Sequence, residues 1–174
     1  ASFVPRTVFR NMAVNERALA FSVIVSTYNS EAWLEKVLQG YAAQSYRDFE
    51  LIVADDGSQP TTQAMVERHA QDYPVPLLHI WHEDQGYRRQ EILNKAIPLA
   101  AHDYLLFTDG DCIPRKEFVD TTALNAQRAS FLSEGYCKFG MALSENISAA
   151  EITSGRCIDM GSLQQNESMT LSNR

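Results

Sequence analysis

The sequence is poor in cysteine and in basic residues and has no long apolar segment, and each shortage excludes a class of protein. Its three cysteines lack Cys-x-x-Cys spacing, which argues against a disulfide framework and against a zinc site. Fifteen Lys and Arg stand against 22 Asp and Glu, a net charge of −7. General nucleic-acid binding is not expected, because it requires clustered cations. No run approaches the ~20 apolar residues of a membrane-spanning helix. We therefore expect a cytoplasmic protein without a transmembrane segment, for which peripheral docking at the inner face of the membrane stays open.

The chain also lacks the two commonest phosphate-binding loops, Gly-x-Gly-x-x-Gly and Gly-x-x-x-x-Gly-Lys-Ser/Thr. Its four histidines show no metal-ligand spacing, and no role is assigned to them. What is present, in 174 residues of which 45% are hydrophobic, suits one domain with a substantial core. We expect a leader over residues 1–20, an α/β domain over 21–144 and a C-terminal extension over 145–174. The extension should be partly disordered from Gly161 onward, because its tail is polar and without periodicity.

Apolar, β-branched runs alternate with helical patterns along the chain. Strands are expected at residues 21–27, 49–54, 77–81 and 104–108, with a further strand at 131–139. Helices are expected at residues 31–43, 58–72, 87–101 and 115–129, and Pro98 should shorten or kink the third. This alternation predicts a mainly parallel sheet with helices on both faces.

Polar and charged residues gather where the predicted strands end, which is where such folds bind ligands. They are Thr27-Tyr28, Asp55-Asp56, Arg88-Arg89 and Asp109-Gly110-Asp111. Two carboxylates one residue apart can hold a divalent cation that keeps other coordination positions for water and phosphate oxygens. Taken alone, each group has a simpler interpretation, such as a solvated turn or a helix cap. Together they predict one site built from several strand ends.

Four segments in this order resemble the family 2 inverting glycosyltransferases, which have the GT-A fold. They are VIVSTYNSEAWLEKVL, AAQSYRDFELIVADDGS, HEDQGYRRQEILNKAI and DYLLFTDGDCIPRKEFV, within residues 21–143. The resemblance implies a Rossmann-like nucleotide-diphospho-sugar-binding domain and a metal-dependent hexosyltransferase, with a UDP-sugar as donor and Mn²⁺ or Mg²⁺ as cofactor. The third and fourth segments are most similar to the branch that acts in bacterial surface polysaccharide or glycoconjugate synthesis, with a saccharide or lipid-linked acceptor.

The resemblance also implies roles for single residues. Thr27 and Tyr28 would line the base and ribose, and Asp56, with Asp55 beside it, would accept a hydrogen bond from the base imide. Arg88 or Arg89 would lie near the base and diphosphate. Asp109, Gly110 and Asp111 form the Asp-x-Asp motif (DxD). Asp111 would touch the metal directly, and Asp109 would hold the ribose or a metal-bound water.

After this motif the sequence departs from the family pattern, which places a catalytic carboxylate in a later Glu-Asp type segment. The catalytic residue is therefore unknown from the sequence, and Glu145, Glu151 and Asp159 are candidates by elimination. Two readings stay open: a glycosyltransferase, or a nucleotide-sugar-binding module that is inactive alone because the acceptor and base region is missing. A nucleotidyltransferase is a third, for which the Gly-rich basic N-terminal signature is absent. Exposed apolar surface on the C-terminal side would favour a homo-oligomer or a covering partner.

Overall fold

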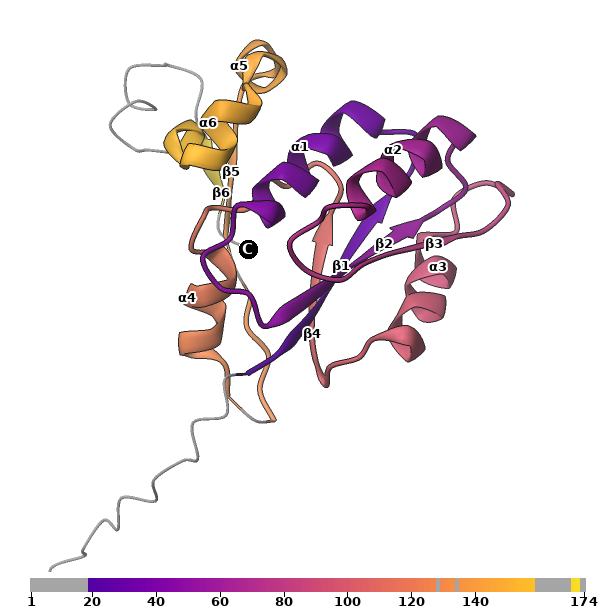
Figure 1. Ribbon diagram of the computed structural model, residues 1–174, viewed down its shortest axis with the longest axis horizontal. Helices are drawn as coiled ribbons and strands as arrows, with labels where there is room; N and C mark the ends of the chain where they lie inside the picture. The colour runs from indigo at the N-terminus through magenta and orange to yellow at the C-terminus, as the bar shows by residue number, and fades with distance from the viewer. Residues whose placement is uncertain (1–18, 128, 134, 159–169, 173–174) are drawn as a thin grey trace, which may run out of the picture.

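The computed structural model describes residues 19–127, 129–133, 135–158 and 170–172 (Figure 1). Its strands are β1 Phe21–Thr27, β2 Phe49–Asp55, β3 Leu77–Trp81, β4 Tyr104–Asp109, β5 Tyr136–Lys138 and β6 Thr170–Ser172. Its α-helices are α1 Glu31–Ala42, α2 Pro60–Ala70, α3 Arg89–Ala96, α4 Phe118–Asn125, α5 Met141–Asn146 and α6 Ala149–Ser154. Two short 3₁₀ helices are η1 Ile97–Leu99 and η2 Arg156–Ile158.

Four parallel strands in the order β3-β2-β1-β4 form the main sheet, as the sequence predicts. In the register, Ser26 lies beside Asp109 on one side, and Thr27 lies beside Asp55 on the other. The carboxyl ends of β1, β2 and β4 are therefore level with one another. The segments that follow these strands emerge at one edge of the sheet, and the predicted site residues emerge with them.

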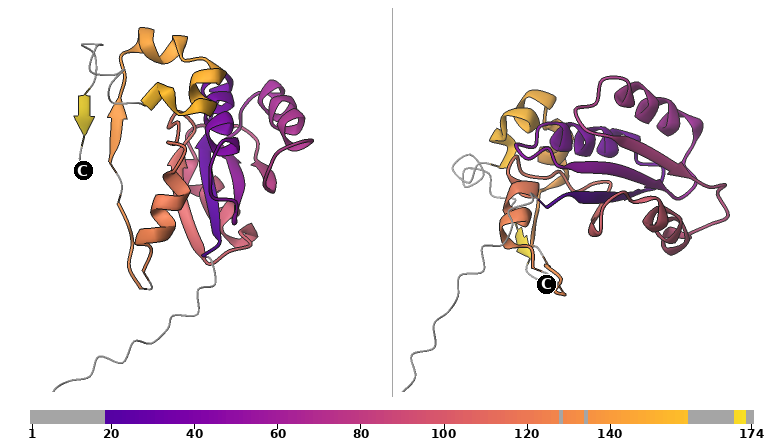
Figure 2. Two further views of the ribbon diagram at one scale, coloured as in Figure 1. Left: turned by 60° about the vertical axis from the view of Figure 1, so that its left-hand side comes forward. Right: turned by 60° about the horizontal axis from the view of Figure 1, so that its bottom comes forward.

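Helices cover both faces of the sheet, which confirms the predicted layers (Figures 1 and 2). Val23 and Val25 point to one face and pack with buried residues of α1, α2 and α4. Ile24, between them, points to the other face and packs with Ile92 and Ala96 of α3. Each fully buried aliphatic side chain of this kind contributes roughly 1.5–3 kcal/mol. Burial on both faces explains why β1 and β2 are almost continuously apolar.

The predicted helices are longer than the observed ones, and at the starts of α2 and α3 the missing residues belong to loops of the site. The helix predicted at 87–101 is α3 followed by η1, and Pro98 lies within η1, where a tighter turn tolerates its missing N–H. The helix predicted at 58–72 begins only at Pro60, because the backbone of Gln59 is extended, with a ψ of 157°. The helix predicted at 115–129 is reduced to α4.

The strand predicted at 131–139 is wrong over most of its length. Of the described residues in this range, only Tyr136–Lys138 forms a strand, β5, which pairs antiparallel with β6. Phe131 is 89% exposed, so an apolar residue here does not mark a buried strand. Residues 141–154 form α5 and α6, although the sequence shows little pattern there.

Residues 1–18 of the predicted leader and residues 159–169 and 173–174 of the predicted C-terminal extension lie outside the described residues. Within the part of the extension that is predicted to be loose, Thr170–Ser172 forms β6. Among the residues described, the helices are too short or too polar to traverse a lipid bilayer.

Candidate functional site

Asp55 and Asp56 are adjacent in sequence, but their carboxylates have different hydrogen-bond partners. Asp55 is fully buried; its Oδ1 accepts from the backbone N–H of Ser58 at 2.8 Å, and its Oδ2 lies 3.0 Å from Nε2 of His79. These contacts shape the loop after β2. The nucleotide contact predicted for Asp55 stays a prediction, and the geometry assigns Asp55 a supporting position.

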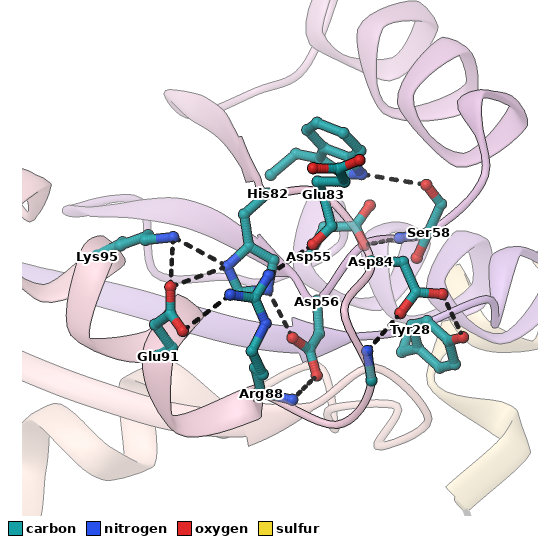
Figure 3. Close-up of polar contacts among 12 residues, drawn as sticks. Tyr28, Asp55, Asp56, Ser58, His82, Glu83, Asp84, Arg88, Glu91 and Lys95 are labelled. Carbon is teal, nitrogen blue, oxygen red and sulfur yellow. Dashed lines mark hydrogen bonds and ion pairs between the residues drawn. The ribbon is translucent and has the colours of Figure 1, made fainter.

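Asp56 stands at the centre of the polar cluster in Figure 3. Its side chain is nearly buried, with 4% of the residue exposed. His82 Nε2 lies 2.6 Å from its Oδ1, and the backbone N–H of Arg88 donates to its Oδ2 at 2.9 Å. Its own N–H donates to the carbonyl of Thr27 at 2.9 Å, which ties the end of β2 to the end of β1. Asp56 is thus an oriented carboxylate whose oxygens face donors.

Residues 82–88 connect β3 to α3 and form the wall of this cluster; we call them the 82–88 loop. Asp84 of this loop accepts the Tyr28 hydroxyl at 2.9 Å and the Gly86 N–H at 3.0 Å. The Gly86 N–H, followed by the Tyr28 hydroxyl, lowers the pKa of Asp84, and the anion beside Tyr28 raises the pKa of that phenol. Tyr28 remains 50% exposed, so its ring can still present a face to a ligand.

Arg88 and Arg89, which the sequence leaves as alternatives, point to different partners. The Arg88 guanidinium donates to the carbonyl of Glu83 at 2.6 Å and to Glu91 at 3.1 Å, and so braces the loop. Arg89 donates to the Ser26 hydroxyl at 2.9 Å and to Asp109 Oδ1 at 2.5 Å. Arg89 is therefore the cation that lies at the Asp-x-Asp motif.

Asp109 and Asp111 are exposed on the turn that leaves β4. The N–H of Gly110 in this turn donates to the carbonyl of Ser26 at 2.8 Å, which seats the motif on β1. Ser26 and Arg89 both bond to Oδ1 of Asp109, and among the described residues this leaves Oδ2 for another ligand.

Three potential ligand atoms gather at this turn: oxygens of Asp109 and Asp111 and the sulfur of Cys112, all within 4.8 Å of one another. Burial, and next the negative charge of Asp111, raises the pKa of the Cys112 thiol to about 11, so the sulfur is protonated when no cation is bound. A neutral thiol is a poor ligand, whereas carboxylate oxygens suit Mg²⁺ and Mn²⁺. The donor set therefore fits the predicted hard cation through the two carboxylates.

Thr27 contributes its backbone more than its side chain. Its carbonyl accepts from Asp56, and its hydroxyl is buried without a hydrogen-bond partner in the part of the chain that is described. The contact predicted between Thr27 and the nucleotide stays a prediction.

The three candidate catalytic carboxylates differ in their surroundings. Glu151 accepts from the N–H and hydroxyl of Ser148 in a capping box at the start of α6, and these bonds lower its pKa. Glu145 lines an open surface pocket with Ala32, Trp33 and Lys36 of α1, and Lys36 bonds to its backbone carbonyl at 2.9 Å. Asp159 lies outside the described residues.

Sequence reasoning missed His79, His82 and Asp84, which hold Asp55, Asp56 and Tyr28 in place. Metal-ligand spacing gave no signal because these histidines bind carboxylates. A usable signal was their position: His79 lies within β3 and His82 directly follows it, and Trp81 at the end of β3 is level with Asp55 in the sheet.

Comparison with known proteins places this geometry in context. A family profile described as glycosyl transferase family 2 matches residues 22–130. The chain is 32% identical over 102 residues to validoxylamine A glucosyltransferase of Streptomyces hygroscopicus subsp. limoneus, which covers 58% of this chain and 22% of that protein. It is 31% identical over 107 residues to poly(ribitol-phosphate) beta-N-acetylglucosaminyltransferase TarS of Staphylococcus aureus, which covers 60% of this chain and 18% of that protein.

Solved structures show the same fold. A TarS fragment in complex with UDP-GlcNAc superposes with a TM-score of 0.52 at 30% identity, covering 61% of this chain and 30% of that one. The mannosyltransferase PcManGT of Pyrobaculum calidifontis, in complex with GDP-Man and Mn²⁺, gives a TM-score of 0.54 at 26% identity, covering 62% and 32%. The chain thus spans only about a fifth to a third of the proteins it matches.

Proposed function

The chain belongs to glycosyl transferase family 2, and we propose that it binds a UDP-sugar with Mn²⁺ or Mg²⁺ and transfers the sugar to an acceptor hydroxyl with inversion. The observation that carries the proposal is the meeting of three groups at one sheet edge. These are the oriented carboxylate of Asp56, the guanidinium of Arg89 and the carboxylates of Asp109 and Asp111.

The base would lie between Asp56 and Tyr28. A nearly buried carboxylate rejects a base that offers it no N–H donor, because a polar group would be left unpaired. The half-exposed ring of Tyr28 can stack on a base, a contact worth roughly 1–3 kcal/mol. UDP is the expected nucleotide because of the UDP-GlcNAc bound to TarS, whereas the GDP-Man bound to PcManGT makes GDP the first competitor to test.

The diphosphate would lie between Arg89 and the Asp-x-Asp turn. Asp111 would ligate the cation, and Asp109 would offer it the oxygen that Ser26 and Arg89 do not bond. A bound divalent cation would neutralise charge on the departing nucleotide. Arg89 adds a cation on the other side of the Asp109 carboxylate, where it can donate to phosphate oxygens.

The acceptor hydroxyl needs a general base, and we assign that role to Glu145. Its pocket lies against the first turns of α1, which follow directly after Tyr28 and Asn29. Glu151 is a weaker candidate, because its carboxylate is already held in the capping box. The acceptor is proposed to be a saccharide or lipid-linked glycan of a bacterial surface, in keeping with the poly(ribitol-phosphate) named for TarS.

Replacing Glu145 by Gln is expected to lower kcat about 100-fold or more, because a general base contributes about 10²–10⁴ to the rate. The KM for the donor should hardly change. The matched control is Glu151→Gln, since Gln serves as well as Glu at this position of a capping box and transfer should continue. Measured sugar transfer from UDP-GlcNAc to a glycan acceptor distinguishes them. If Glu151→Gln loses transfer and Glu145→Gln retains it, the assignment of the base is wrong.

Nucleotide binding itself is tested by thermal unfolding with UDP, GDP, dTDP and ADP, each with and without Mn²⁺. A ligand at 100 times its Kd should stabilise the fold by about 2.7 kcal/mol, which raises Tm by about 5–10 °C in a chain of this size. The largest shift is expected with UDP and Mn²⁺ together. No shift with any nucleotide would refute the donor site. Binding without transfer to any acceptor would favour the nucleotide-sugar-binding module.

A further inference from the structure

We propose that His82, held by Lys95, is a positioning residue that keeps Asp56 a pure hydrogen-bond acceptor and thereby sets which nucleobases the site admits. The inference rests on the proposed function, because it concerns the base of the same nucleotide. It assigns a role to two residues that neither touch the metal nor line the Asp-x-Asp turn.

His82 joins Asp56 to α3 through both of its ring nitrogens (Figure 3). The residue is 8% exposed. Its Nε2 lies 2.6 Å from Asp56 Oδ1, and its Nδ1 lies 3.1 Å from Lys95 Nζ. Glu91 stands behind this pair, 2.8 Å from Lys95 and 3.9 Å from Nδ1 of His82. Asp84 also interacts electrostatically with His82.

The position of Lys95 determines which ring nitrogen of His82 carries the proton. A lysine ammonium has three donors and no acceptor, so the Nδ1 that it approaches acts as the acceptor. The neutral ring then carries its proton on Nε2, which faces Asp56. If the ring were doubly protonated, Nε2 would still be a donor. In both cases Asp56 receives a hydrogen bond on Oδ1.

The second oxygen of Asp56, Oδ2, is also held as a hydrogen-bond acceptor. The backbone N–H of Arg88 donates to Oδ2 at 2.9 Å, and a backbone amide cannot reverse its role. Two donors therefore hold both carboxylate oxygens in place as acceptors, and each oxygen keeps a lone pair for one further donor. An incoming base must supply that donor. The imide N3–H of uracil or thymine, or the amide N1–H of guanine, does so, whereas at the equivalent position N3 of cytosine and N1 of adenine are acceptors.

Loss of the His82 donor should change this preference and not merely weaken binding. With the His82 donor removed, only the backbone N–H of Arg88 still holds the Asp56 carboxylate, which can then turn away from the incoming base. N3 of cytosine would no longer meet an acceptor oxygen that is fixed against it. The expected signature is therefore a narrower ratio between UDP and CDP affinities. A residue that only supports the fold would weaken both nucleotides by the same factor.

The experiment measures the Kd values of UDP and CDP, with Mn²⁺, for the unmodified chain and for four variants, one of them a control. Wild type is expected to favour UDP by about 100-fold or more, since sites built around a hydrogen bond reject analogues that lack it by large factors. His82→Leu should narrow this ratio by about tenfold or more. His82→Gln should keep it within about threefold, because the Gln amide can donate from near the Nε2 position. If wild type prefers GDP, GDP and ADP form the equivalent pair.

Lys95→Met provides a test that is independent of the buried histidine. Its side chain is 46% exposed, so the variant should fold normally. Lys95→Met should narrow the ratio between the UDP and CDP affinities, as His82→Leu does, but by a smaller factor. The reason is that Nδ1 of His82 is then free to carry the proton. The control is Lys116→Met, an exposed lysine after the Asp-x-Asp turn, which should leave the ratio unchanged.

An unchanged UDP to CDP ratio in folded His82→Leu and in Lys95→Met would overturn the inference. Equal weakening of both nucleotides would overturn it too, because it would indicate a structural role only. If wild type bound none of UDP, CDP, GDP and ADP, the result would be different in kind. It would overturn the proposed function and this inference with it.

Discussion

Replacing Asp111 by Asn is expected to abolish metal-dependent nucleotide binding. Asn has the same shape but no charge, and a hard cation with few protein ligands loses most of its affinity when one carboxylate is neutralised. Among the described residues, Asp111 has no cationic partner that the change would leave unpaired, so the fold should be unaffected. The Kd for UDP in the presence of Mn²⁺ should rise by about 100-fold or more, equivalent to about 2.7 kcal/mol.

The measurement is a UDP titration with and without Mn²⁺, and the control is Asp103→Asn. Asp103 is an exposed carboxylate at the opposite end of β4, directly before Tyr104. Its replacement removes the same charge from the same strand without reaching the site. If Asp111→Asn kept its full response to Mn²⁺ while Asp103→Asn did the same, the metal assignment would have to be abandoned.

The second large effect is expected at Gly57, where replacement by Ala should destabilise the fold by about 3 kcal/mol or more. Gly57 has a φ of +96°, which L residues rarely adopt, and a Cβ there would lie 2.6 Å from Cα of Asp84. The obstacle is backbone, so it cannot move aside as a flexible side chain would. Thermal unfolding should show Tm lowered by about 6–12 °C.

Gly86 supplies a control for backbone strain alone. Its φ is +86°, but a Cβ at this position would meet nothing within 4 Å. Gly86→Ala should therefore cost only the strain of a left-handed residue, about 1–2 kcal/mol. The difference between the stability losses of Gly57→Ala and Gly86→Ala measures the effect of the close approach between Gly57 and Asp84. Equal losses of stability would show that this close approach does not exist in solution.

The sequence predicted the central sheet well, because β1 and β2 are apolar runs whose composition reflects burial, and β3 and β4 at the sheet edges are apolar runs that are partly buried. The bounds of β1 and β3 are those expected, residues 21–27 and 77–81. The small sheet of β5 and β6 could not be found in this way. Its strands have three residues each and depend on pairing between segments more than 30 residues apart.

The sequence predicted where the candidate site lies but not which side chains within it contact one another. The strand ends that carry Asp56 and Asp109 identify the edge, because parallel strands bring their carboxyl ends together. The sequence could not distinguish Asp55 from Asp56, since successive residues of an extended chain point to opposite sides. Nor could it decide between Arg88 and Arg89, whose partners lie on different elements.

The 82–88 loop makes the contacts of the base-binding half of the site depend on one another. His82, Asp84 and the backbone of Arg88 reach Asp56, Tyr28 and the Gly57 turn from one short segment. Displacing the loop therefore alters all of these contacts at once. Energetic effects of substitutions around it should be strongly non-additive, as is usual for residues that share partners. Evolution of base preference in this chain would then require concerted change in the loop, whereas the Asp-x-Asp turn on β4 can vary independently.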